Sequence, residues 1–163
     1  MRDLDLGHGF EVYYVPSMTT AAEPTTSPAE VVTTMLEALQ DGDVDKALDL
    51  LAEDAAWINV SLPTVRQKRR IERILRGLDG SSYFRVHFHN VAEHGDVVLT
   101  ERTDALGIGR FEQRFWVYGR FEVRNGKITV WRDSFDWGDI LVSLVRAVLG
   151  LAAPGLNRPW PGD

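Results

Sequence analysis

Two aspartates and one arginine stand at positions from which their side chains could act together. Arg102 and Asp104 are two residues apart in a predicted β-strand, residues 96–106, so both side chains point to the same face of a sheet. Asp133 lies in the last predicted strand, on the same face as Trp131. Arginine stays positively charged at any relevant pH, so between two aspartates it can hold one as a carboxylate while the pair shares a proton. Such a pair offers an acid and a base at once, although surface ion pairs are the more common role of these residue types.

The elements that would carry these residues are helices in the first half of the chain and strands in the second. Ser27 and Glu30 form a capping box around Pro28, which predicts a helix that stops near Gly42, and Asp43 can cap a second helix. Helices followed by an antiparallel meander predict the α+β class. The other expected elements are a strand over residues 54–60, a helix over 67–78, strands over 83–92, 96–106, 110–123 and 127–135 with turns at His94-Gly95 and Asn125-Gly126, and a final helix after Asp139.

The chain is expected to form one main domain with a segment on either side. Residues 1–17 do not resemble a signal peptide, because acidic residues interrupt any apolar core. Residues 140–153 contain Arg146 and fall short of the ~20 residues that a membrane span needs. We therefore expect no membrane span and a cytoplasmic location. The predicted parts are an N-terminal extension and linker (1–26), a single catalytic domain (27–153) and an irregular C-terminal tail rich in Pro and Gly (154–163).

Composition narrows the classes of partner. The 24 acidic and 18 basic residues leave a net charge of −6, which argues against general affinity for nucleic acid or anionic membranes. The absence of cysteine excludes disulfides, thiolate nucleophiles and Cys-based zinc sites. A small neutral or apolar ligand is the partner that this composition favours.

Other candidate residues have simpler explanations. His87 and His89 share a predicted strand face, but no third ligand has comparable spacing, so we expect no metal site. The basic residues of the helix over 67–78 are expected to form a solvated face, because no aromatic residues alternate with them. The aromatic residues of the last strands are expected to line the core or a lipophilic cavity; they are Phe115, Trp116, Tyr118, Phe121 and Trp131.

Four segments in order carry a resemblance to a known family. They are residues 52–60 (Ala-Glu-Asp-Ala-Ala-Trp-Ile-Asn-Val), Leu62-Pro63, residues 100–104 (Thr-Glu-Arg-Thr-Asp) and residues 126–136, which end in Trp-Arg-Asp-Ser-Phe-Asp. Together they resemble the limonene-1,2-epoxide hydrolase family over about residues 28–139. The third and fourth segments are specific in combination, and neither is decisive alone.

The resemblance implies a fold, an activity and roles for five residues. The implied fold is a cone-shaped NTF2-like domain, with a curved mixed or antiparallel sheet and helices packed over a deep apolar pocket. The implied reaction is one-step, cofactor-free hydrolysis of a lipophilic epoxide to a vicinal diol, by a homodimeric enzyme. Asp133 would be the general base, Asp104 the general acid and Arg102 the bridge between them. Asn59 would position the attacking water, together with Trp57, which stands where the family has tyrosine.

Two alternatives stay open, because the implied fold also serves other functions. A ketosteroid isomerase or polyketide cyclase of this fold would need an oxyanion donor that faces one base, rather than an arginine between two carboxylates. A catalytically silent domain that binds a hydrophobic ligand gains nothing from buried charge.

Overall fold

The computed structural model describes residues 26–77 and 81–161. The predicted extension, apart from residue 26, and the expected helical residue Leu78 lie outside these ranges. The helices are α1 (Pro28–Gln40), α2 (Val44–Asp49), α3 (Lys68–Gly77) and α4 (Trp137–Gly150), with a 3-10 helix at Pro154–Leu156. The strands are β1 (Leu51–Asn59), β2 (Val65–Arg66), β3 (Ser82–His94), β4 (Val97–Ile108), β5 (Phe111–Arg124) and β6 (Lys127–Ser134).

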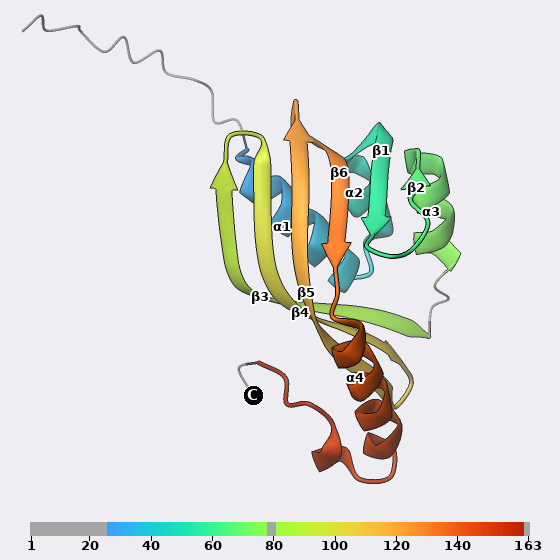
Figure 1. Cartoon of the computed structure of the whole chain (residues 1–163). Coiled ribbons are helices and arrows are strands. Elements are labelled where there is room, and N and C mark those ends of the chain that lie inside the picture. Colours follow the sequence, from blue (N-terminus) through green and yellow to red (C-terminus); the bar gives the residue numbers. More distant parts are fainter. Residues whose placement is uncertain (1–25, 78–80, 162–163) are drawn as a thin grey trace, which may run out of the picture.

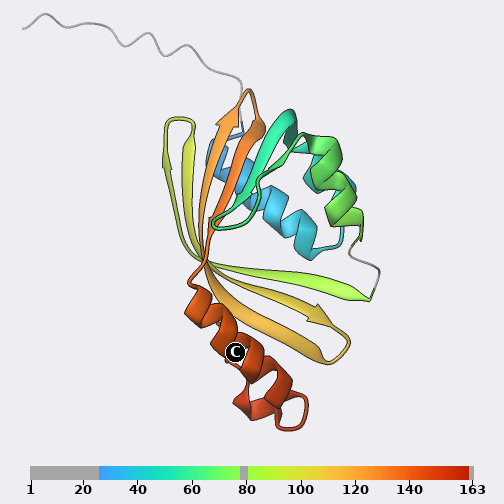
Figure 2. The ribbon, with the colours of Figure 1, turned by 45° about the vertical axis from the view of Figure 1, so that its right-hand side comes forward.

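The strands form one mixed sheet in the order β2-β1-β6-β5-β4-β3 (Figure 1). β1 and β6 are parallel, and the other neighbours are antiparallel. Figure 2 shows that β3, β4 and β5 bend toward the side on which α1, α2 and α3 lie, so the sheet is concave toward these helices. The predicted α+β class with a curved mixed sheet is confirmed.

The capping chemistry expected for α1 is present. The Ser27 hydroxyl accepts the Glu30 backbone N–H at 3.2 Å, and the Glu30 carboxylate accepts the Ser27 N–H at 2.8 Å, while Pro28 occupies the first helical turn. The buried face of α1 packs against the sheet, and its apolar residues are part of the hydrophobic core. The buried residues of α1 are Val31, Val32, Met35, Leu36 and Ala38.

The predicted elements differ from the observed ones mainly at their ends. β1 begins at Leu51, three residues before the expected start. The turn between β5 and β6 lies at Asn125-Gly126 as predicted, with positive φ angles of 51° and 71°. The prediction that the last helix follows Asp139 was wrong. Asp136 caps α4 instead, because its side chain accepts the N–H groups of Gly138 and Asp139 at 2.8 and 3.1 Å.

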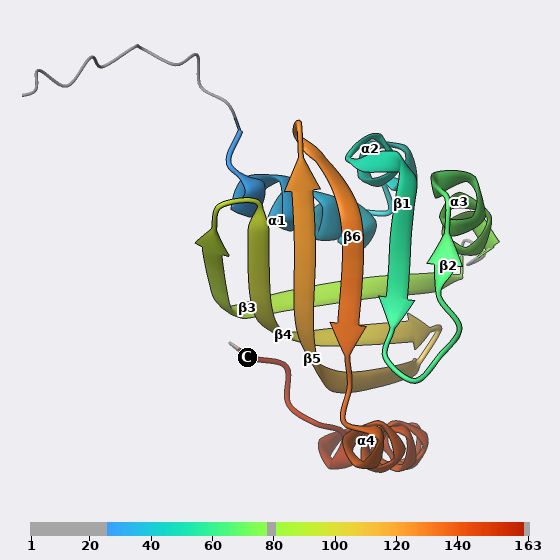
Figure 3. The ribbon, with the colours of Figure 1, turned by 45° about the horizontal axis from the view of Figure 1, so that its top comes forward.

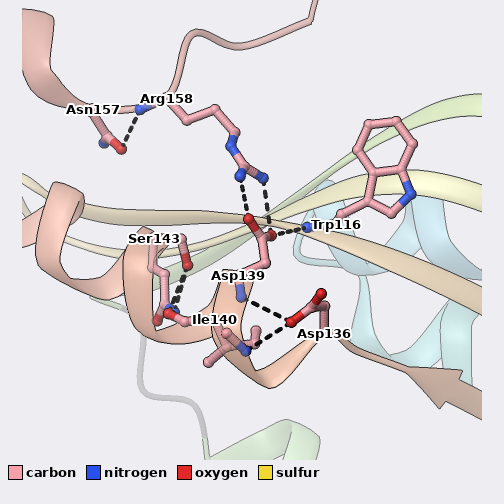
Figure 4. A network of polar contacts seen from close by, with 9 residues as sticks. Trp116, Asp136, Asp139, Ile140, Ser143, Asn157 and Arg158 are labelled. Carbon is pink, nitrogen blue, oxygen red and sulfur yellow. Dashed lines mark hydrogen bonds and ion pairs between the residues drawn. The ribbon is translucent and has the colours of Figure 1, made fainter.

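α4 lies along the edge of β5, in the part of the sheet that β6 does not reach (Figure 3). There the Asp139 carboxylate accepts the Trp116 backbone N–H at 3.2 Å and also pairs with Arg158, so it fixes both the strand edge and the tail (Figure 4). Gln113 donates to the Ile140 carbonyl at 3.0 Å. No helix in the described part of the chain is long and apolar enough to cross a membrane.

Candidate active site

Cross-strand pairing brings the predicted residues together on the concave face. Asp133 of β6 is opposite Asn59 of β1 on one side and Gly119 of β5 on the other, and Gly119 is opposite Thr100 of β4. Directly opposed residues of a sheet point to the same face. Arg102 stands two residues after Thr100 on that face, so its side chain can reach Asp133 across Gly119.

Arg102 bridges the two aspartates as the sequence predicts. Its Nη2 donates to Asp133 Oδ1 at 2.6 Å, and its Nε donates to the Asp104 oxygens at 2.9 and 3.1 Å. Its Nη1 donates to the Thr100 hydroxyl at 2.9 Å. Arg102 is 0% exposed, Asp104 5% and Asp133 4%, so the three form a buried triad and not a surface ion pair.

The pKa values of Asp104 and Arg102 are shifted in this buried triad. Burial raises the pKa of Asp104 to about 7, because its effect exceeds the opposing effect of Arg102, and the Asp133 carboxylate adds to the rise. Burial alone would lower the pKa of Arg102, but Asp133 and Asp104 hold it above its usual value. A carboxyl group with a pKa near neutral can both hold and release a proton at physiological pH.

Asp133 has a second donor that the sequence did not indicate. The Trp131 indole N–H donates to Asp133 Oδ2 at 2.7 Å. The Trp131 ring stacks on Trp57 with centroids 4.7 Å apart and faces Phe121 at 6.3 Å. Both carboxylate oxygens of Asp133 are therefore held by donors, one charged and one neutral.

The two predicted water-positioning residues lie next to the triad. Asn59 is opposite Asp133 in register and is half-buried. Trp57 is opposite Trp131, and its buried indole N–H has no acceptor among the described residues. Both side chains share the face of Asp133, as parallel pairing requires.

Thr100, Gly119 and Trp131 complete the site, and sequence reasoning assigned no role there to any of them. A Cβ at Gly119 would lie 2.2 Å from Arg102 Nη1 and 2.4 Å from Thr100 Oγ1. The two-residue spacing from Thr100 to Arg102 could have predicted that Thr100 lies on the same face of the sheet as the triad. Gly119 had no such signal, because its place under the guanidinium depends on the pairing of β5 with both neighbours.

The predicted aromatic cluster is divided between the two faces of the sheet. Phe115, Phe121 and Trp131 lie on the face of the triad, whereas Trp116 and Tyr118 line a cavity of about 570 Å³ on the opposite face. As expected, each of them lies in the core or lines a cavity, but on two sides of the sheet, because residues of odd and even number on β5 point to opposite faces. A deep apolar pocket next to the triad stays a prediction.

The two histidines have structural contacts. His89 stacks on Trp116 with centroids 4.4 Å apart and hydrogen-bonds to Thr103 Oγ1 at 2.9 Å. His87 contacts His89 edge-on. Within residues 26–77 and 81–161, no three His, Cys, Asp or Glu side chains are grouped to hold a metal ion. Four basic residues of α3 are exposed, as expected of a solvated face, and they are Arg69, Arg70, Arg73 and Arg76. Lys68 is half-buried and pairs with Glu53 at 3.5 Å.

Comparison with known proteins is consistent with this geometry. Residues 26–146 match the family model described as the limonene-1,2-epoxide hydrolase catalytic domain. The chain is 42% identical over 126 residues to epoxide hydrolase EphG of Mycobacterium tuberculosis, a match that covers 77% of this chain and 85% of that protein.

Solved structures agree. An LEH-like epoxide hydrolase of M. tuberculosis is 40% identical and superposes with a TM-score of 0.80 over 85% of this chain and 100% of that one. An NTF2-like protein from Cytophaga hutchinsonii, 15% identical with a TM-score of 0.60, covers 74% of this chain and 99% of its own, and it shows the shared fold alone. The buried triad lies within the matched region, and the chain belongs to the limonene-1,2-epoxide hydrolase family.

Proposed function

We propose that this protein hydrolyses a lipophilic epoxide to a vicinal diol by direct attack of water, with Asp133 as general base and Asp104 as general acid. Epoxide hydrolysis follows from membership of the family. The observation that carries the mechanism is the buried Arg102, which donates to both carboxylates. A carboxyl with a pKa of about 7 beside a carboxylate held by two donors is an acid next to a base.

The reaction balances with these groups. The water oxygen forms a bond to an epoxide carbon while Asp133 takes one of its protons. The C–O bond of the strained ring breaks, and the departing oxygen takes the proton of Asp104. The site then holds a proton on Asp133 and a carboxylate at Asp104, so one proton must return to Asp104 before the next turnover.

Asn59 and Trp57 are proposed to hold the attacking water. The water can donate to Asp133 and to the amide oxygen of Asn59, which leaves its lone pairs for the epoxide carbon and for one donor. The indole N–H of Trp57 can be that donor, since it has no acceptor among the described residues. A buried donor without an acceptor costs about 1–3 kcal/mol, so a water that accepts from it stabilises the site.

The alternative isomerase or cyclase fits this geometry less well. Those reactions need a donor that is free to stabilise an oxyanion. Arg102 cannot be that donor, because each of its guanidinium nitrogens already has an acceptor, on Asp104, Thr100 and Asp133. A domain that only binds an apolar ligand is also disfavoured, because it would gain nothing from the buried charges of Arg102, Asp104 and Asp133.

Isotope labelling tests the mechanism. A panel of terpene, styrene, fatty-acid and sterol epoxides would identify a substrate, and the protein would then be used in excess in ¹⁸O-water for a single turnover. Direct attack places the label in the diol. Unlabelled diol in the first turnover would mean that a carboxylate of the protein supplies the oxygen, which excludes the one-step mechanism.

The family resemblance also implies a homodimer, and α4 offers a surface for one. The helix buries Ser143 and Ala147, whereas Leu141, Val145 and Val148 are 63%, 51% and 53% exposed. Contiguous exposed apolar residues are typical of an association surface. Light scattering coupled to size exclusion should give a dimer mass, and Val145→Lys should lower it towards the monomer. A cytoplasmic location stays a prediction.

A further inference from the structure

The two aspartates of the triad differ in their donors. Both oxygens of Asp104 face the same Arg102 Nε, at 2.9 and 3.1 Å. The oxygens of Asp133 have separate donors, Arg102 Nη2 at 2.6 Å and Trp131 Nε1 at 2.7 Å. An indole N–H donates and never accepts, so a proton on either oxygen of Asp133 weakens a hydrogen bond from a separate donor. Asp104 has one donor for two oxygens, so when one oxygen carries a proton the other can still accept from Arg102 Nε.

The Trp131 N–H is held in place by a stack of rings across three strands. Trp57 of β1, Trp131 of β6 and Phe121 of β5 are directly opposed in register. The plane of the Trp131 ring is inclined by 21° to that of Trp57 and by 22° to that of Phe121, and Trp131 is 5% exposed. The ring cannot turn away from Asp133 without breaking this packing, so the donor is oriented before any substrate binds.

The described residues that flank Asp133 in the sheet are uncharged. Its partner on β1 is the neutral Asn59, its partner on β5 is Gly119, and the buried residues of α1 are apolar. The charged groups that face it from β4 are Arg102 and Asp104. Arg102 donates to both aspartates, whereas the Trp131 N–H donates to Asp133 and not to Asp104.

We propose that Trp131 is the positioning residue that assigns the shared proton to Asp104, by stabilising the carboxylate form of Asp133. Trp131 thereby decides which aspartate is the base and which is the acid. The raised pKa of Asp104 agrees with this assignment. The catalytic consequence rests on the proposed hydrolase function, but the position of the proton does not.

Carbon-13 NMR of labelled aspartate carboxyl groups tests the proposal without a substrate. The Asp104 and Asp133 signals would be assigned with Asp104→Asn and Asp133→Asn and followed over pH in the parent and in Trp131→Phe. Loss of a hydrogen bond to a charged group is expected to move the Asp133 titration to higher pH by about one unit. Asp133 should then take part in the neutral titration step of the pair. An unchanged Asp133 titration would overturn the proposal.

Trp116→Phe is the matched control. Unlike the indole N–H of Trp131, its buried indole N–H has no acceptor among the described residues, and it lies on the opposite face of the sheet. The same chemical change should therefore leave both aspartate titrations in place. An equal shift in this control would overturn the proposal. If Trp131→Phe does not fold, as judged by a thermal melt, 3-benzothienylalanine at position 131 keeps the ring size and replaces only the N–H.

The pH profile of catalysis gives a second readout. In Trp131→Phe, kcat/KM at neutral pH should fall by about 10-fold, and the acidic limb should move to higher pH by about one unit. A uniform loss with both limbs unmoved would indicate a purely structural role and would count against the proposal. If the parent turns over no epoxide, the proposed function fails, while the carboxyl titrations still decide the role of Trp131.

Discussion

At the scale of single residues, the guanidinium of Arg102 uses all three of its nitrogens inside the protein. Nε, Nη1 and Nη2 donate to Asp104, Thr100 and Asp133 respectively. Removing one member of a buried ion pair leaves an uncompensated charge and typically costs about 3–5 kcal/mol. Deletion of Arg102 would therefore confuse loss of folding with loss of catalysis. Amide substitutions of the aspartates keep their shape and are the more informative changes.

Asp104→Asn and Asp133→Asn should each lower turnover by at least ~10²-fold, because each removes one half of the acid–base pair. The double variant should lose much less than the product of the two single losses, since groups that act as a unit are not additive. Steady-state kinetics on an identified epoxide give the three values. Glu101→Gln, which makes the same chemical change next to Arg102 on the opposite face, should stay near the parent. Multiplicative losses in the double variant would show independent roles.

Trp57→Phe should lower turnover by about 10-fold or more, because it keeps the ring that stacks on Trp131 but deletes a water donor, a loss of about 1.4 kcal/mol. Trp57→Tyr restores a donor at the position where the family has tyrosine, so it should keep measurable activity and favour bulkier epoxides. Kinetics at matched thermal stability provide the test. If Trp57→Phe and the parent have equal turnover numbers, Trp57 only packs, and Asn59 and Asp133 hold the water without it.

At the scale of elements, β5 contributes to the site by the absence of a side chain. Gly119 lies under the Arg102 guanidinium, and a methyl group there would overlap Arg102, Thr100 and the Phe121 ring, with contacts of 2.2, 2.4 and 2.7 Å. Contacts below 3.0 Å force a shift. Because the surrounding core is closely packed, the arginine has no free volume to occupy.

Gly119→Ala should therefore displace Arg102 and lower kcat/KM by ~10²-fold or more, with a loss of stability of about 1–3 kcal/mol from overpacking. Kinetics and urea unfolding measure the two effects. Gly77→Ala is the matched control, since a Cβ at the end of α3 meets no atom of the described residues within 4 Å. Near-parental kcat/KM in Gly119→Ala would mean that the triad tolerates a shift of its arginine.

At the scale of the whole molecule, burial of Asp104 links folding to pH. Its folded-state pKa of about 7 lies above the ordinary value of 3.8, so between these values the folded protein holds a proton that the unfolded chain has released. This group therefore stabilises the fold fully below pH 3.8 and loses that contribution as the pH rises to about 7. The loss is up to about 1.4 kcal/mol per pH unit.

The Asp104→Asn side chain cannot ionise. The free energy of unfolding of this variant should therefore increase relative to that of the parent as the pH rises from about 4 to about 7. Urea unfolding at several pH values measures this difference. Glu101→Gln makes the same chemical change outside the triad and is the control across the same range. A constant difference between Asp104→Asn and the parent would show that Asp104 does not retain its proton in the folded state.

The sequence by itself determined the features that depend on a few neighbouring residues. The capping box of Ser27 specified the start of α1, and period-two spacing placed Arg102 and Asp104 on one face and Asp133 beside Trp131. These features follow from local backbone geometry, which is the same wherever the strand lies. The resemblance to the family added the pairing of residues that no local pattern connects.

Only the tertiary structure decided which strands are neighbours and in what register. β1 pairs with β6 in parallel and shifts its register between Leu51 and Ala56, which brings Asn59 opposite Asp133 and Trp57 onto Trp131. The pairing of β5 with β4 and β6 places Gly119 under the arginine. Register is set by hydrogen bonds and packing between segments far apart in the chain, and a slip of one residue would turn each of these side chains to the other face. No local pattern specifies the strand register, because the register depends on how the whole sheet packs around one core.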